Sequence, residues 1–137
     1  MRRAGACGGV LDLGGNLVVF GEGPGREVGV VDPDDPQSLL LVVPVAEGAV
    51  ATSGQYERFV AVDGQAFGHI LDPRTGWPVA PGISATVLAP QAMWADALAT
   101  AVVVLGVAEG LALLESLPGT EGVVVGPRGV RMTSGLR

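Results

Sequence analysis

The hydrophobic pattern of this sequence changes its period once, directly after Pro90. Upstream, short apolar runs alternate with polar residues or end at Gly and Pro, which is typical of strands joined by turns. Residues 91–107 are instead rich in alanine, free of proline and apolar nearly all round, and this predicts a helix buried between other elements. The sequence as a whole therefore predicts an α+β fold in which antiparallel β-sheet packs on helices.

The remaining pattern predicts a series of short strands and a second helix. Residues 38–45 form a continuous apolar run, typical of a strand covered on both faces. Asp63 and Gly64 form a two-residue hairpin signal that returns the chain as a strand containing His69. The second helix is predicted over residues 109–117, and strands are predicted over residues 9–20 (in two pieces), 27–32, 38–45, 49–52, 56–63, 65–71, 83–88, 123–125 and 130–133.

Size and charge limit the classes of function. The chain has 137 residues, 48% of them apolar and 16% charged, which predicts one folded domain over residues 1–137. A net charge of -6, with no basic run longer than Arg2-Arg3, argues against non-specific binding to nucleic acid. The longest strongly apolar run, residues 97–108, is well short of the ~20 residues that a membrane helix needs, so no membrane span is expected.

Asp96 and Thr100 stand four residues apart on the predicted helix, so their oxygens share one face, one turn apart. A carboxylate and a hydroxyl so placed can hold a hard cation such as Mg²⁺, which takes the rest of its oxygen shell from water and phosphate. Spacing alone equally allows Asp96 to cap the helix start, with the Thr100 hydroxyl bonded to a backbone carbonyl.

His69 is the only imidazole in the chain, and its unperturbed pKa lies near neutrality. With Asp72 beside it across a turn, His69 could transfer a proton while the carboxylate fixes its tautomer. The alternative is a polar strand residue that its neighbours satisfy. Residues 72–76 predict a turn in which Asp caps, Pro fixes φ and Gly closes.

Two further groups suit either a ligand or an ordinary turn. Gly14, Gly15 and Asn16 tolerate positive φ, which fits a hairpin turn or a close approach of backbone amides to a ligand. Residues 52–54 offer two hydroxyls and an open backbone position where a strand is predicted to end, which suits a phosphate as well as a turn.

Taken in order, five segments resemble the ApbE family, the FAD:protein FMN transferases. They read DLGGN, VGVVDP, ATSGQYERF, HILDPRTGWPV and ADALATA, and the last three are individually distinctive. The resemblance runs through essentially the whole chain and corresponds to the C-terminal half of the family pattern. It implies the C-terminal half of a T-fold-like architecture, with antiparallel sheet packed against a buried helix pair.

The resemblance implies a Mg²⁺-dependent reaction on FAD as substrate. FAD is cleaved at its pyrophosphate, FMN is joined through a phosphoester to a Thr or Ser of an acceptor flavoprotein, and AMP is released. The implied metal ligands are Asp96 and Thr100, and the implied catalytic residues are His69 and Asp72. The implied flavin- and phosphate-binding residues are Gly14, Gly15, Asn16, Thr52, Ser53, Gly54 and Thr75.

Members of the resembled family are about twice as long as this chain, so alternatives stay open. Another chain could supply the N-terminal half, or the sequence could be a fragment or a remnant with a reduced role. Two other functions fit the same residues: hydrolysis of the FAD pyrophosphate to FMN and AMP, and flavin binding without catalysis. Family members are commonly exported or membrane-tethered, but the chain shows no apolar segment typical of an export signal, so no compartment is predicted.

Overall fold

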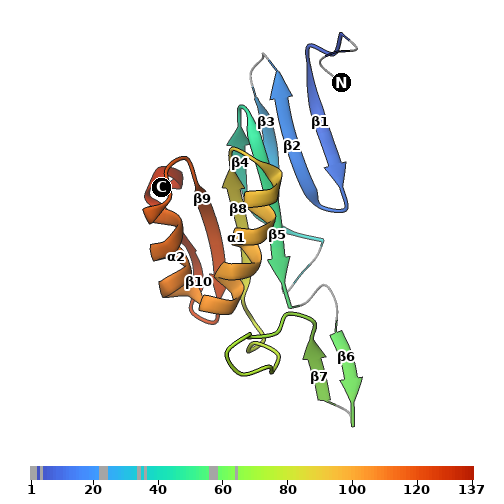
Figure 1. The fold of residues 1–137 in the computed structure, drawn as a ribbon, viewed down its shortest axis with the longest axis vertical. Helices are drawn as coiled ribbons and strands as arrows, with labels where there is room; N and C mark the ends of the chain where they lie inside the picture. Colours follow the sequence, from blue (N-terminus) through green and yellow to red (C-terminus); the bar gives the residue numbers. More distant parts are fainter. Residues whose placement is uncertain are drawn as a thin grey trace.

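The computed structural model describes residues 3, 5–21, 25–33, 35, 37–55, 59–63 and 65–137. Within these residues the chain forms ten strands, two α-helices and a C-terminal 3-10 helix (Figure 1). The strands are β1 (Gly8–Leu13), β2 (Asn16–Gly21), β3 (Arg26–Val31), β4 (Leu39–Val45), β5 (Gly48–Gly54), β6 (Phe59–Val62), β7 (Gln65–Gly68), β8 (Ser84–Ala89), β9 (Glu121–Gly126) and β10 (Gly129–Met132). The helices are α1 (Ala92–Leu105), α2 (Val107–Ser116) and η2 (Ser134–Leu136).

Six of these strands form one antiparallel sheet in the order β1-β2-β5-β8-β9-β10. Strands β5 and β8 lie in the middle and pair from Ala49 with Ala89 to Gly54 with Ser84. Every residue of β8 except Leu88 is buried, because this strand is covered on both faces of the sheet. The predicted α+β class, with antiparallel sheet packed on helices, is confirmed.

The helices cover one face of the sheet, and small residues allow α1 to lie close to it. Ala95 and Ala99 of α1 are fully buried, and they belong to a core cluster with Ala51 of β5 and Val87 of β8. Leu114 of α2 joins the same cluster and is fully buried. These contacts hold α1 across β5 and β8, with α2 against β9.

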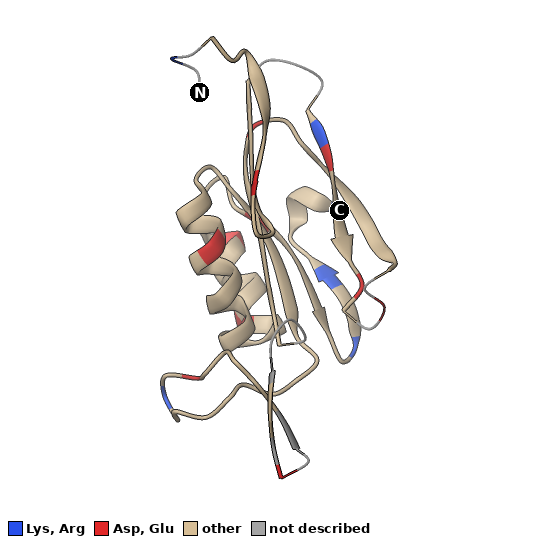
Figure 2. Ribbon diagram, turned by 90° about the vertical axis from the view of Figure 1, so that its right-hand side faces the viewer, with Lys and Arg blue, Asp and Glu red and all other residues tan. Residues whose placement is uncertain are grey.

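The β3–β4 hairpin covers the opposite face. Val43 of β4 packs with Val30 of β3 and Val123 of the sheet, and Val45 packs with Val19 and Val50. Figure 2, turned by 90°, shows the helices and this hairpin on either side of the sheet, with charged residues scattered over strands, turns and helices. Residues 38–45 were predicted to be covered on both faces, and this is wrong: Val43 and Val45 pack on the sheet, but Val42 on the other face is 48% exposed.

The helix predicted over residues 91–107 is present, but it is not buried on all sides. Met93 and Trp94 on its outer side are 70% and 54% exposed, because only the face toward the sheet is covered. The helix starts at Ala92 after Gln91, so Asp96 is its fifth residue and does not cap it. No helix among the described residues is long and apolar enough to cross a membrane.

Two strand ends were also predicted wrongly. Strand β5 continues through Ser53 to Gly54, because both residues keep their pairing with β8. Strand β7 ends at Gly68, so His69 follows the strand instead of lying in it. The β6–β7 hairpin is confirmed, with Val62 paired to Gln65 and Asp63 at a positive φ of 50°. Gly64 of the predicted turn and residues 56–58 of the predicted strand lie outside the described residues. The second helix and the last hairpin are also confirmed, with bounds that differ by a few residues.

Candidate functional site

The β1–β2 turn brings a side-chain amide to helix α1. Gly14 and Gly15 have φ of 66° and 91°, which is the backbone that a two-residue turn between paired Leu13 and Asn16 requires. The Gly15 N–H donates to the Asp12 carboxylate at 2.9 Å. Asn16, the first residue of β2, then donates from Nδ2 to Oδ1 of Asp96 at 3.2 Å.

One turn further along α1, a second strand meets the helix. The Ser53 and Thr100 hydroxyls are hydrogen-bonded at 3.0 Å, and the Thr100 hydroxyl also donates to the Asp96 carbonyl at 3.3 Å. Residues 49, 51 and 53 of β5 all point toward the helices, because side chains alternate along a strand. Asn16, Ser53, Asp96 and Thr100 therefore form one row, which we call the polar ledge.

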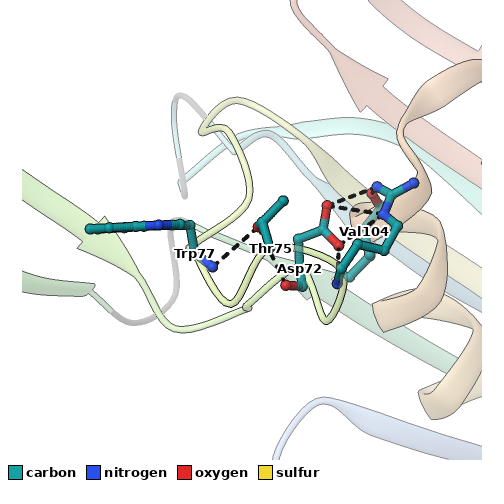
Figure 3. Close-up of polar contacts among 5 residues, drawn as sticks. Asp72, Thr75, Trp77 and Val104 are labelled. Atoms are coloured by element: carbon teal, nitrogen blue, oxygen red, sulfur yellow. Dashed lines mark hydrogen bonds and ion pairs between the residues drawn. The ribbon is translucent and has the colours of Figure 1, made fainter.

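The loop that follows His69 ends in the predicted turn. The Asp72 carbonyl accepts from the backbone N–H groups of Thr75 at 3.1 Å and Gly76 at 2.8 Å, and Gly76 has a positive φ of 72°. The Thr75 hydroxyl accepts from the Trp77 N–H at 3.2 Å (Figure 3). Thr75 thus serves the turn, and its side chain remains exposed.

Arg74 connects this turn to α1. Its guanidinium binds both carboxylate oxygens of Asp72, with the shortest contact at 2.8 Å, and its Nη2 lies 3.5 Å from the carbonyl oxygen of Val104 (Figure 3). Val104 lies in the last turn of α1, and the negative end of the helix dipole there also stabilises a cation. Because Val104 follows Asp96 by eight residues, Arg74 binds about 12 Å from Asp96 along the helix axis.

The Asp72 carboxylate is therefore engaged by Arg74. The guanidinium and, next, the backbone N–H of Arg74 hold the pKa of Asp72 below its ordinary value. The backbone N–H donates to Oδ1 at 2.9 Å. A carboxylate bound this way is a poor proton acceptor near neutral pH, and its described contacts orient Arg74.

Gln55, which the sequence reasoning missed, lies directly after β5 and is only 7% exposed. Its Nε2 donates to the carbonyls of Ile70 and Val79, both at 3.1 Å, and its Oε1 accepts from the Ile70 N–H at 3.3 Å. His69 precedes Ile70 and is exposed. A single glutamine after a strand has no pattern that reveals such a role, because its partners lie 15 and 24 residues away.

The three residues 52–54 were predicted to bind phosphate together, but the structure places Thr52 and Gly54 away from the polar ledge. Thr52 points to the face of the sheet opposite α1, where its hydroxyl pairs with that of Thr86 at 2.8 Å. Gly54 is buried at the end of β5, opposite Ser84. Ser53, between them, is the member of residues 52–54 that reaches the polar ledge.

The oxygen atoms of the polar ledge would supply only part of the ligand shell of a hard cation. The Asp96 carboxylate and the hydroxyls of Thr100 and Ser53 are oxygen ligands of the kind that Mg²⁺ prefers. Within the described ranges no group of three or more His, Cys, Asp and Glu side chains could hold a metal. A Mg²⁺ ion at the ledge would therefore need further oxygens from phosphate and water, which is the usual way that Mg²⁺ binds at phosphate sites.

A hollow of about 530 Å³ lies elsewhere on the chain, beside the β3–β4 hairpin and the β9–β10 turn. Its lining includes Gln55, Asp32, Gly82, Ile83 and Pro127, but no residue of the polar ledge. Size alone would favour this hollow as a binding site. The polar ledge is the better candidate on chemical grounds, because it brings together a carboxylate, an amide and two hydroxyls from three elements that are far apart in the sequence.

Comparison with known proteins agrees with this fold. The model of the ApbE family matches residues 1–124, and the chain therefore belongs to this family. The FAD:protein FMN transferase of Treponema pallidum is 39% identical in an alignment that covers 93% of this chain and 39% of that protein. The FAD:protein FMN transferase of Escherichia coli K12 is 37% identical over 103 residues, covering 74% of this chain and 28% of that protein.

Two solved structures show the same fold. The ApbE protein of Thermotoga maritima superimposes with a TM-score of 0.81 at 34% identity, covering 93% of this chain and 43% of that one. The flavinyl transferase ApbE of Pseudomonas stutzeri, in its apo form, gives a TM-score of 0.76 at 28% identity, covering 97% and 43%. The chain thus spans about two-fifths of the length of these relatives.

Proposed function

We propose that this chain carries the pyrophosphate-binding and proton-transfer residues of a Mg²⁺-dependent FAD:protein FMN transferase. The observation that carries the proposal is the polar ledge on one side of α1, with the Arg74 guanidinium at the C-terminal end of the same helix. The ledge presents amide, hydroxyl and carboxylate groups, and Arg74 presents a cation that suits a phosphate. The relatives named above are FAD:protein FMN transferases, which supports the same substrate.

The proposed reaction is a displacement at phosphorus with transfer of one proton. The hydroxyl of a Thr or Ser on the acceptor flavoprotein attacks the phosphorus on the FMN side of FAD. A new P–O bond forms as the bond to the bridging oxygen breaks, and AMP leaves with that oxygen. A ring nitrogen of His69 takes the hydroxyl proton, which its exposed position after β7 permits.

Asp96 and Thr100, with Ser53 beside them, would hold Mg²⁺ against the pyrophosphate. A bound Mg²⁺ supplies neutralisation of phosphate charge and alignment of the leaving group. Asn16 orients the Asp96 carboxylate through its 3.2 Å hydrogen bond. Asp72 is a positioning residue in this account, because it holds the guanidinium of Arg74.

Flavin transfer can be measured directly. The chain is incubated with FAD, Mg²⁺ and a peptide that bears a flavinylation threonine, alone and with a separately expressed N-terminal segment of the Treponema pallidum relative. We expect a fluorescent peptide whose mass increases by that of FMN less one water, together with an equal amount of AMP. EDTA should abolish both products.

The other outcomes contradict the proposal in different ways. AMP released without any acceptor would identify a pyrophosphate hydrolase. FAD fluorescence that is quenched equally with and without Mg²⁺, with no product, would identify a flavin-binding module. No flavin transfer under either condition would remove the transferase assignment.

A further inference from the structure

The two residues that flank His69 are both held against the side chain of Gln55. On one side, the Ile70 N–H and carbonyl are bound by the Gln55 amide at 3.3 and 3.1 Å. On the other side, a Cβ atom added to Gly68 would overlap the Cδ, Oε1 and Nε2 atoms of the Gln55 amide. The φ of Gly68 is not in the left-handed region, so the glycine is required by the space that the amide occupies.

Gln55 also closes the loop that begins at Ile70. Its Nε2 bonds the Val79 carbonyl at 3.1 Å, while the Val79 N–H donates to the Ile70 carbonyl at 3.0 Å. The side chain of Ile70 is buried in the core beneath α1. The loop over residues 70–79 is therefore fixed at its base by Gln55, and its tip is fixed to α1 by Arg74.

An apolar side chain could fill the same space but could not replace these bonds. Gln55 satisfies two carbonyls and one N–H at a point where its own amide is buried. Loss of the amide would take the Gln55 partner from the Ile70 N–H and the Val79 carbonyl, and because buried backbone groups without partners are strongly disfavoured, the loop base would have to move to find water. A shift of this base moves His69, because the histidine is covalently joined to Ile70.

We propose that Gln55 is the positioning residue for His69: its buried amide fixes the backbone on both sides of the histidine and so sets where the imidazole lies. The proposal rests on the proposed function for the role of His69, but the position of the imidazole can be measured without turnover. Gln55 touches neither FAD nor the acceptor in this account. Its loss should therefore affect the chemical step more than the binding of FAD.

The test uses the whole chain and two independent perturbations of the same contact. Gln55→Leu removes all three hydrogen bonds at similar volume, and Gly68→Ala places a methyl group against the amide. Thr120→Val is the matched control, because Thr120 is also 7% exposed and bonds a backbone carbonyl, that of Leu117, at 2.8 Å. His69 is the only histidine, so its ring resonances are identified in a proton NMR spectrum without further assignment.

We expect the His69 ring resonances to change in Gln55→Leu and in Gly68→Ala, and to stay at the wild-type position in Thr120→Val. In the transfer assay, kcat should fall about 10-fold or more in the first two variants, with KM for FAD within about twofold of wild type. Compared at one low pH, the Gln55→Glu spectrum should lie nearer to wild type than the Gln55→Leu spectrum, because the protonated carboxyl regains one donor.

Three results would overturn the inference. The first is a His69 resonance that stays at its wild-type position in both Gln55→Leu and Gly68→Ala while the variants remain folded. The second is a His69 resonance that moves equally in the Thr120→Val control. The third is a kcat that falls only in proportion to the folded fraction. If wild type transfers no flavin, the NMR result still decides whether Gln55 positions His69, and only the proposed function fails.

Discussion

Replacing Asp96 by asparagine separates a carboxylate that holds a cation from one that only stabilises the helix. The variant keeps the size of the side chain and removes one negative charge. Asp96 is exposed and is the fifth residue of α1, so it lies beyond the first turn, where the helix dipole acts most strongly. Its described structural bond is the one from Asn16 at 3.2 Å.

The cost to stability should therefore be small. An exposed hydrogen bond to a charged group contributes about 0.5 kcal/mol, and the remaining dipole interaction contributes less than that. A total below about 1 kcal/mol lowers the Tm of a chain of this size by at most about 4 °C. Loss of one metal ligand instead removes several kcal/mol from the transition state, which is about 100-fold or more in rate.

The assay measures Mg²⁺-dependent flavin transfer and Tm on the same preparation. Glu115→Gln is the matched control, because Glu115 is also an exposed helical carboxylate and accepts two hydrogen bonds from Ser134, at 2.7 and 2.9 Å. We expect Asp96→Asn to lose transfer and Glu115→Gln to keep it, with both variants folded. Unchanged Mg²⁺ dependence in Asp96→Asn would refute the metal assignment for Asp96, and with it most of the case for Thr100.

Two further predictions concern stability. The pKa of Asp72 is lowered in the folded state by Arg74, so the stabilisation is present above the ordinary carboxyl pKa of about 3.9 and is lost as the pH falls through the lowered value. Asp72→Asn should therefore be less stable than wild type at pH 6, and a plot of Tm against pH should show the difference disappearing once the pH falls below the lowered pKa of Asp72; a constant difference would contradict this. The Thr52–Thr86 hydroxyl pair gives a second test: Thr52→Val should cost about 1 to 2 kcal/mol in urea unfolding by leaving the buried Thr86 hydroxyl unpaired, and the double valine variant should cost less than the sum of the two single ones. Strict additivity would show that the hydroxyls act independently.

The sequence predicted what depends on periodicity. The change of pattern after Pro90 identified α1 to within two residues of either end, because small and apolar residues are continuous there. The same pattern could not show which side of the helix the sheet covers. Met93 and Trp94 are apolar yet exposed, so hydrophobicity alone made the helix look buried all round.

The turn over residues 72–76 could also be predicted from the sequence. Residues 72–76 carry their own signal, since Asp, Pro and Gly each fix part of the backbone. The exact end of β5 was missed for a related reason. Ser53 and Gly54 have the composition of a turn, but pairing with the buried strand β8 keeps them extended, and tertiary context overrides the local preference.

The contacts that build the candidate site could be predicted only in part. The Thr100 hydroxyl bonds the backbone carbonyl of Asp96, as one of the two sequence-based expectations had it, and a shared cation for Asp96 and Thr100 stays a prediction. The bond between Asn16 and Asp96 joins residues 80 apart, and that between Ser53 and Thr100 joins residues 47 apart. Such contacts depend on how strands cross the helix, which no local pattern encodes. The role of Gln55 stayed hidden for the same reason.

The position of the metal and of FAD tests the account most directly. Mn²⁺ takes the same oxygen ligands as Mg²⁺ and broadens nearby NMR signals. In an amide NMR spectrum of the whole chain with FAD, sub-stoichiometric Mn²⁺ should broaden the signals of Asn16, Ser53, Asp96 and Thr100 first, and Asp96→Asn should remove the effect. Broadening centred on Asp32 and the hollow beside it, or broadening that is unchanged in Asp96→Asn, would contradict the polar ledge as the site of FAD cleavage.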